Sequence, residues 1–113
     1  MRYAQGEGPM YLPSEVQKQP QINAAVSEVV KELSPWVRHI RYDIAQDWSG
    51  EWGVFFRVLL SDEASKRKNL RQVTPQVISR LSERVYVPDL GLHPYFNFRS
   101  ESEQAQLIDP AWA

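Results

Sequence analysis

Acidic residues around the middle of the chain are the first candidates for chemistry. They are Asp43, Asp47, Glu51, Asp62 and Glu63. A metal-dependent nuclease needs carboxylates that converge on a divalent cation, usually with a lysine beside them. No lysine stands two residues after either glutamate, where the chain has Gly53 and Ser65. The pattern therefore favours turn and helix-capping roles for these acids over catalysis.

The other residue types that support catalysis are equally isolated. His39 and His93 are far apart and match no metal-ligand spacing. Ser49 lacks the glycine that precedes the serine of a nucleophile elbow, because Asp47 occupies that position. The glycines form no phosphate-binding run before a helix, and the chain has no cysteine. We therefore expect no catalytic residue, no metal and no cofactor, and we expect the protein not to be an enzyme.

Aromatic residues stand at positions where a partner protein could contact them. The chain has four tryptophans, five tyrosines and four phenylalanines. Trp48 and Trp52 flank a Ser-Gly pair, and Trp112 is the penultimate residue. A large ring at a turn or a chain end must fold back on its own domain or be covered by a partner. Two alternatives stay open: Trp48 and Trp52 pair across a strand ladder, or they form a contact surface with Tyr95 and Trp112.

A basic segment offers a different kind of contact. Between residues 64 and 84 the chain has six basic residues and one acid. The basic residues are Lys66, Arg67, Lys68, Arg71, Arg80 and Arg84. A positive stripe on a helix is what phosphate binding requires, and Trp48 or Trp52 could stack on bases of a single strand. The segment predicts nucleic-acid binding as the alternative function, against the simpler interpretation of a solvated helix face.

Hydrophobic periodicity predicts the elements that must position these residues. Ile22, Val26, Val29 and Leu33 recur at helical spacing, whereas residues 40–44 alternate between apolar and polar as in a strand. Residues 54–60 are almost continuously apolar, which is typical of a central strand. The expected elements are a helix over 20–34, strands over 36–46 and 52–61 joined by a hairpin with Ser49-Gly50 at its tip, two helices over 62–73 and 75–85 or one kinked helix, a strand over 95–100, and a short helix over 100–108.

This order predicts an α+β fold, a small two-layer sandwich with the order α-β-β-α(α)-β-(α). We expect a three-stranded, mainly antiparallel sheet with the helices packed on one face. The strand, strand, helix, helix, strand part resembles the arrangement of KH domains, but the helix junction "RQVTPQ" lacks their Gly-x-x-Gly clamp. Residues 1–13, rich in glycine and proline, are expected to be a flexible arm, and residues 14–113 a single domain.

Composition limits the function classes further. The chain has 113 residues and a formal net charge of −1, which argues against a general polyanion binder. The first 20 residues contain no apolar core of a signal peptide, and a cytoplasmic protein is expected. The leading prediction is a non-catalytic protein–protein interaction module, an accessory, regulatory or antitoxin-like subunit. Its partner is expected to be another protein or a second copy, bound at the hairpin tip or at the open edge of the third strand.

Overall fold

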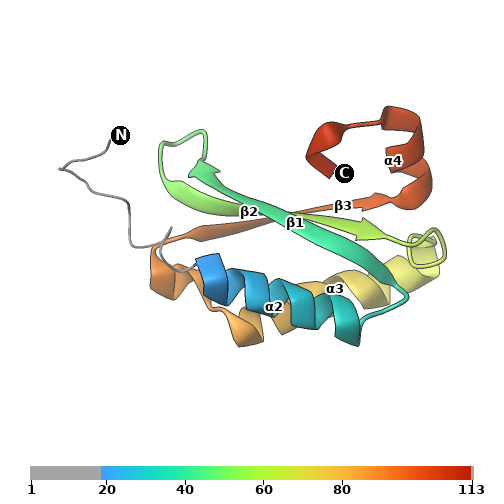
Figure 1. Ribbon diagram of the computed structural model, residues 1–113, viewed down its shortest axis with the longest axis horizontal. Helices are drawn as coiled ribbons and strands as arrows, with labels where there is room; N and C mark the ends of the chain where they lie inside the picture. Colours follow the sequence, from blue (N-terminus) through green and yellow to red (C-terminus); the bar gives the residue numbers. More distant parts are fainter. Residues whose placement is uncertain (1–18, 113) are drawn as a thin grey trace.

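A three-stranded sheet with two long helices on one face forms the body of the protein (Figure 1). The computed structural model describes residues 19–112, so the predicted arm at residues 1–13 lies outside the described residues. The elements in chain order are α2 (Gln19–Glu32), β1 (Val37–Gln46), β2 (Trp52–Leu60), α3 (Arg67–Arg84), η1 (Val87–Leu90), β3 (His93–Ser100), α4 (Glu101–Leu107) and η2 (Pro110–Trp112). The predicted α+β class and the element order are confirmed.

The sheet has the order β1-β2-β3. β1 and β2 form the predicted antiparallel hairpin, while β2 and β3 are parallel. The sheet is therefore mixed, where the sequence indicated a mainly antiparallel one. The reason is α3, which takes the chain back along the sheet so that β3 starts at the same end as β2.

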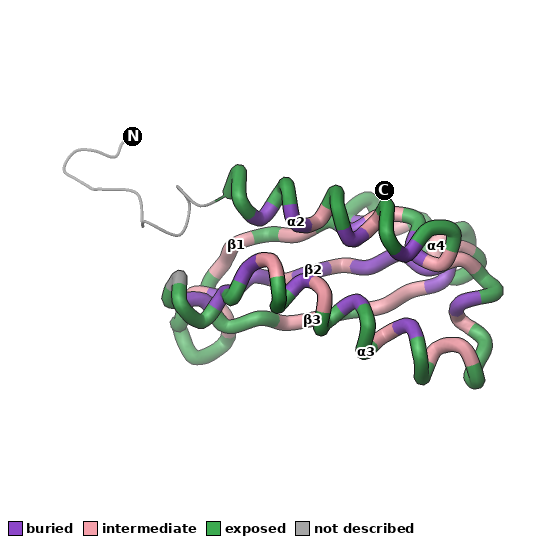
Figure 2. The backbone as a smooth tube through the Cα atoms, turned by 90° about the horizontal axis from the view of Figure 1, so that it is seen from below, coloured by how far each residue is buried: buried purple, intermediate pink, exposed green. Residues whose placement is uncertain are grey.

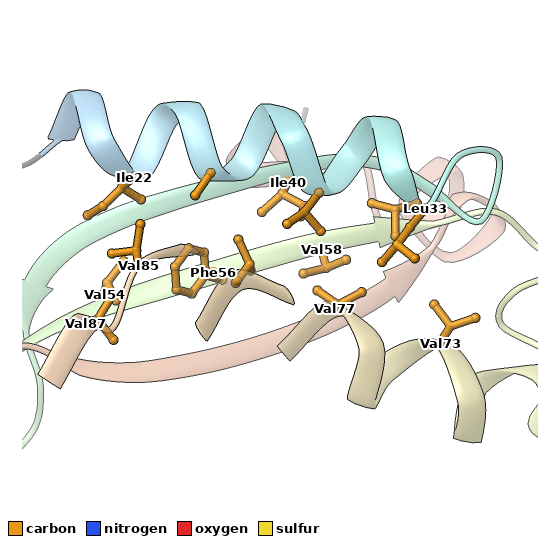
Figure 3. Close-up of a cluster of buried hydrophobic side chains, with 14 of the residues drawn as sticks. Ile22, Leu33, Ile40, Val54, Phe56, Val58, Val73, Val77, Val85 and Val87 are labelled. Atoms are coloured by element: carbon orange, nitrogen blue, oxygen red, sulfur yellow. The ribbon is translucent and has the colours of Figure 1, made fainter. Parts of the chain in front are cut away.

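Both long helices cover the same face of the sheet, where Figure 2 shows them lying side by side. The predicted stripe of α2 is buried at Ile22, Val29 and Leu33. From the sheet, Val54 and Val58 of β2 meet it, with neither exposed to solvent (Figure 3). The central position of β2 explains the near-continuous apolar run in its sequence.

α3 is one continuous helix rather than two helices. Pro75 lies inside it and removes one backbone hydrogen bond. The helix continues through this position because Val73, Val77 and Leu81 form one buried row against the core on both sides of the proline. A continuous helix leaves no helix–helix junction at which a KH-type clamp could form.

The first turn of α3 also differs from the prediction. The helix begins at Arg67, and residues 62–65 form turns instead of its first helical residues. The Oγ of Ser61 accepts a hydrogen bond from the amide of Ala64 at 3.1 Å, so Ser61 caps this turn and not α3. That bond closes the turn after β2. Among residues 19–112, no helix is both long enough and apolar enough to cross a membrane.

Candidate interaction surface

Among the described residues, the face of the sheet turned away from α2 and α3 is covered at one end only. In Figure 1, α4 and the C-terminal segment lie over the end of the sheet where β2 and β3 finish, and the β1–β2 hairpin loop lies at the other end. We call this face the open face, and its two ends the covered end and the hairpin end. The two ends carry one tryptophan each, Trp112 and Trp48.

At the covered end, the C-terminal segment is docked by arginine and histidine side chains. Trp112 is only 6% exposed, and its ring lies under the Arg99 guanidinium, 4.4 Å from the ring centroid. His39 Nε2 lies 2.9 Å from the Trp112 carbonyl, and Arg57 Nε donates to the Ala111 carbonyl at 2.7 Å. Trp112 was a predicted partner-binding residue, but it does not lie on an open surface, because its own domain buries it.

α4 holds that segment over the sheet, and two sets of hydrogen bonds fix the first turn of α4. Ser100 and Glu103 form a capping box, in which each side chain accepts a hydrogen bond from the other residue's backbone amide. Asp62 accepts a second pair of hydrogen bonds from the amide and hydroxyl of Ser102, and these bonds lower the pKa of Asp62. The predicted short helix is confirmed, and it is tied to the end of β2.

At the hairpin end, three aromatic rings lie against one another. Tyr95 stacks on Phe55 with a centroid distance of 4.8 Å and an interplanar angle of 12°. Trp48 also contacts Tyr95, with a centroid distance of 5.6 Å and the two ring planes tilted by 59°. We call these three residues the aromatic surface. Trp48 is 85% exposed, so one face of its indole is open to solvent.

Asp47 holds the aromatic surface to the hairpin loop. Its Oδ1 accepts hydrogen bonds from the amide and hydroxyl of Ser49 and from the amide of Glu51, and its Oδ2 accepts one from the Tyr95 hydroxyl at 2.7 Å. The bonds from Ser49 and Tyr95 hold the pKa of Asp47 well below its usual range. The same bond to Asp47 raises the pKa of Tyr95. Asp47 is thus a positioning residue.

Two glycines shape the same region. Gly50, with φ of +86°, closes the loop after a turn in which its amide donates to the Asp47 carbonyl at 3.0 Å. Gly53 is buried beneath the Tyr95 ring, and a Cβ at this position would lie 2.9 Å from Cε2 of Tyr95 and 3.0 Å from the carbonyl oxygen of His93. The absence of a side chain at Gly53 lets Tyr95 lean toward the hairpin loop and reach Asp47.

Trp52 takes no part in this surface. It is half-buried and packs against the core, and its partner across the β1–β2 ladder is Gln46. Trp48 and Trp52 therefore do not pair with each other across the ladder. Side chains alternate between the two faces of a strand, which places Trp52 with Val54 on the helix side and Phe55 on the open face. Of the predicted contact residues, Trp48 and Tyr95 are brought together.

The predicted basic stripe is divided by its ion pairs. Arg80 and Arg84 bridge α3 to α2 through Glu32 and Glu28, with Nη1 of Arg80 2.9 Å from Oε1 of Glu32 and Nε of Arg84 2.9 Å from Oε1 of Glu28. Lys66 pairs with a residue in the preceding turn, Glu63, at 3.0 Å.

The other three of the six basic residues make no ion pair with any described residue. Arg67, Lys68 and Arg71 are exposed and make no ion pair within residues 19–112. They lie at the start of α3, at the opposite end of the molecule from the hairpin loop (Figure 1). The structure does not bring this basic group together with Trp48 or Trp52.

Three carboxylates, those of Asp43, Asp47 and Glu51, lie around the aromatic surface, and two of them pair with basic side chains. Asp43 pairs with Arg57 at 2.8 Å, and Glu51 contacts Nε2 of His93 at 2.5 Å. Asp47 accepts only from uncharged donors. Within the described part of the chain, no group of three or more histidine, aspartate and glutamate side chains could hold a metal ion. No protein-family model, no curated protein and no solved structure matches the chain.

Sequence reasoning missed Phe55 and Gly53 and gave Asp47 a turn role only. Phe55 belongs to an apolar run that looks like core throughout, and its place beside Tyr95 depends on the parallel β2–β3 register. Gly53 carried a weak signal, because a glycine inside a strand often marks a close approach of another group.

Proposed function

We propose that the protein is a non-catalytic protein–protein interaction module, an accessory or regulatory subunit that binds its partner through the aromatic surface. The observation that carries the proposal is Trp48, whose indole is 85% exposed yet rests on Tyr95. Tryptophan, tyrosine and arginine dominate the binding energy of protein interfaces. A rigid exposed tryptophan also loses little side-chain entropy on binding.

The support is local geometry rather than exposure alone. The Tyr95 ring is fixed by stacking on one side, a hydroxyl bond to Asp47 and the space above Gly53. Trp48 therefore projects from a preformed base, which lowers the cost of ordering the interface. β3 is also an edge strand of the sheet, where a strand of a second copy could pair. Such pairing between two copies stays a prediction.

Capture of a partner by matched variants tests this proposal. Immobilised full-length wild type, Trp48→Ala and Tyr86→Ala are compared in capture from a host extract, followed by identification of the bound protein. Tyr86 is the control because it is a 59% exposed aromatic that lies between α3 and η1, off the open face. We expect wild type and Tyr86→Ala to retain the same protein and Trp48→Ala to lose it. Equal capture by all three variants overturns the assignment of the surface.

A second candidate function rests on the start of α3. Arg67, Lys68 and Arg71 form an exposed basic group without intramolecular ion pairs in residues 19–112, which suits phosphate contacts. Three phosphate contacts predict a slope of about −2 to −3 in a plot of log affinity against log salt concentration. Binding of labelled single-stranded RNA and of single- and double-stranded DNA is measured for wild type and for an Arg67→Glu, Arg71→Glu double variant. Binding that the double variant retains would exclude this group.

A further inference from the structure

Each tryptophan of the open face contacts a residue of β3, Arg99 at Trp112 and Tyr95 at Trp48, but only Trp112 has a cation over its ring among the described residues. Above Trp112 lies the Arg99 guanidinium, whose Nη1 donates a hydrogen bond to Oε1 of Gln104 at 2.9 Å and lies 3.6 Å from a carboxylate oxygen of Asp109. The covered end thus combines an indole with an arginine that lies on it, and the arginine contacts a carboxylate and an amide oxygen. The hairpin end has an indole and carboxylates, but no arginine or lysine lies over Trp48 among the described residues.

We infer that the open face of Trp48 accepts an arginine side chain from a separate partner protein, with Glu51 as its ion-pair partner. This inference rests on the proposed interaction function and names the chemistry of the group that the partner supplies. The partner's guanidinium takes the place at Trp48 that Arg99 takes at Trp112.

Glu51 is the carboxylate available for this contact. Both oxygens of Asp47 already accept hydrogen bonds from Ser49, Glu51 and Tyr95. Glu51 is well exposed, and one of its oxygens contacts His93 while the other has no protein donor within the described residues. A guanidinium can lie flat on an indole and still donate from its edge to a carboxylate, which an ammonium group does less well.

The electrostatics of the surface favour a cationic partner over a nucleic acid. Asp43, Asp47 and Glu51 lie around the aromatic surface, and Arg57 is already engaged by Asp43 and by the Ala111 carbonyl. Arg41 lies on the same face beside Arg57, farther from the hairpin loop than Asp43, so the two arginines are outnumbered by the three carboxylates. Phosphates would meet these carboxylates first. A base could stack on Trp48, but its backbone would be repelled.

An arginine peptide is the direct probe. The ¹⁵N-labelled full-length protein is titrated with acetyl-Gly-Arg-Gly-amide, while the indole N–H signals of its four tryptophans are followed by NMR and assigned with single Trp→Phe variants. The matched control peptide contains citrulline, which has the same shape and no charge. We expect a saturable shift of the Trp48 signal with the arginine peptide and at least about threefold weaker binding of the citrulline peptide. The Trp112 signal should stay in place.

Variants and oligomeric state complete the test. Glu51→Gln should weaken binding of the arginine peptide and leave binding of the citrulline peptide unchanged. Equal affinity for both peptides, or no Trp48 shift at all, overturns the arginine site. If capture of the partner still depends on Trp48 in that case, the interaction function stands without the cation. A dimer that light scattering detects in wild type and not in Trp48→Ala overturns the separate partner in favour of a second copy.

Discussion

Trp112 and Trp48 lie over the same face of one sheet, and the described part of the chain buries only Trp112. Trp112 is 6% exposed beneath Arg99, whereas Trp48 is 85% exposed beside Tyr95. Both rings are held by specific contacts, so the greater exposure of Trp48 does not mean that the hairpin end is disordered. The difference is that α4 and the C-terminal segment cover the open face at the covered end, while no described segment covers the open face at the hairpin end.

This comparison separates residues that stabilise the fold from residues available for binding. At the covered end, the contact between the buried Trp112 ring and Arg99 stabilises the folded chain itself. Loss of this contact should therefore lower the free energy of unfolding. At the hairpin end the same kind of ring contributes little to folding, because most of its surface stays in water.

Trp112→Ala should lower the free energy of unfolding by about 2–4 kcal/mol, because a buried ring and its contact with Arg99 are both removed. Urea denaturation followed by circular dichroism measures the change. Trp48→Ala is the matched control and should stay within about 0.5 kcal/mol of wild type, since its ring is exposed. Equal losses for the two variants contradict the division between the ends.

Gly53→Ala should destabilise the protein by about 1–3 kcal/mol, because the added Cβ meets Tyr95 and the backbone of His93. It should also displace Tyr95 and so weaken partner binding at Trp48. Trp48→Ala should weaken the same binding without a loss of stability. Urea denaturation and the capture assay measure the two effects. Gly50→Ala is a useful contrast, because nothing lies within 4 Å of its added Cβ and any cost comes from its positive φ alone. A Gly53→Ala variant with wild-type stability would argue that Tyr95 does not lie over this glycine.

Ser100→Ala should cost about 1 kcal/mol by removing the capping box of α4. Because α4 carries the segment that covers Trp112, hydrogen exchange of the α4 amides should become faster and the Trp112 indole more accessible. The Trp48 signal should not change. If the Trp48 signal does change, the two ends are coupled rather than independent.

The pH dependence of stability should identify Asp47. Its pKa is depressed in the folded protein, so its contribution is present above its unfolded pKa of about 4 and is lost as the pH falls below that value. Asp47→Asn should therefore be less stable than wild type near neutral pH, and the gap should narrow as the pH drops below about 4. Unfolding curves at several pH values measure this gap. A gap that is constant with pH would show that the charge of Asp47 does not hold Ser49 and Tyr95.

Much of the fold was predictable from local patterns. The stripe from Ile22 to Leu33 and the alternation of β1 gave α2 and the hairpin, because these signals depend only on nearby residues. The parallel pairing of β3 was not predictable in this way, and local patterns left open whether Pro75 divides α3 and whether Trp112 packs on its own domain. Each of these depends on packing between segments distant in the sequence.

The candidate surface was predictable in part for the same reason. Trp48 and Tyr95 were chosen for their residue type and their predicted position, and both lie on the aromatic surface. Phe55, Asp47 and Gly53 acquire their roles only when β3 pairs in register beside β2. The basic stripe lost Arg80 and Arg84 because α2 packs beside α3 and supplies their carboxylates.

Photo-crosslinking from position 48 tests the central claim most directly. A photoreactive phenylalanine derivative, which keeps a large aromatic ring at the site where alanine would remove it, is placed at position 48 or at position 86 of the protein, and cells are irradiated. The account predicts one discrete crosslinked protein from position 48 that is absent from position 86. Crosslinks of equal yield from both positions, or none from position 48 alongside a partner captured elsewhere on the molecule, would contradict it.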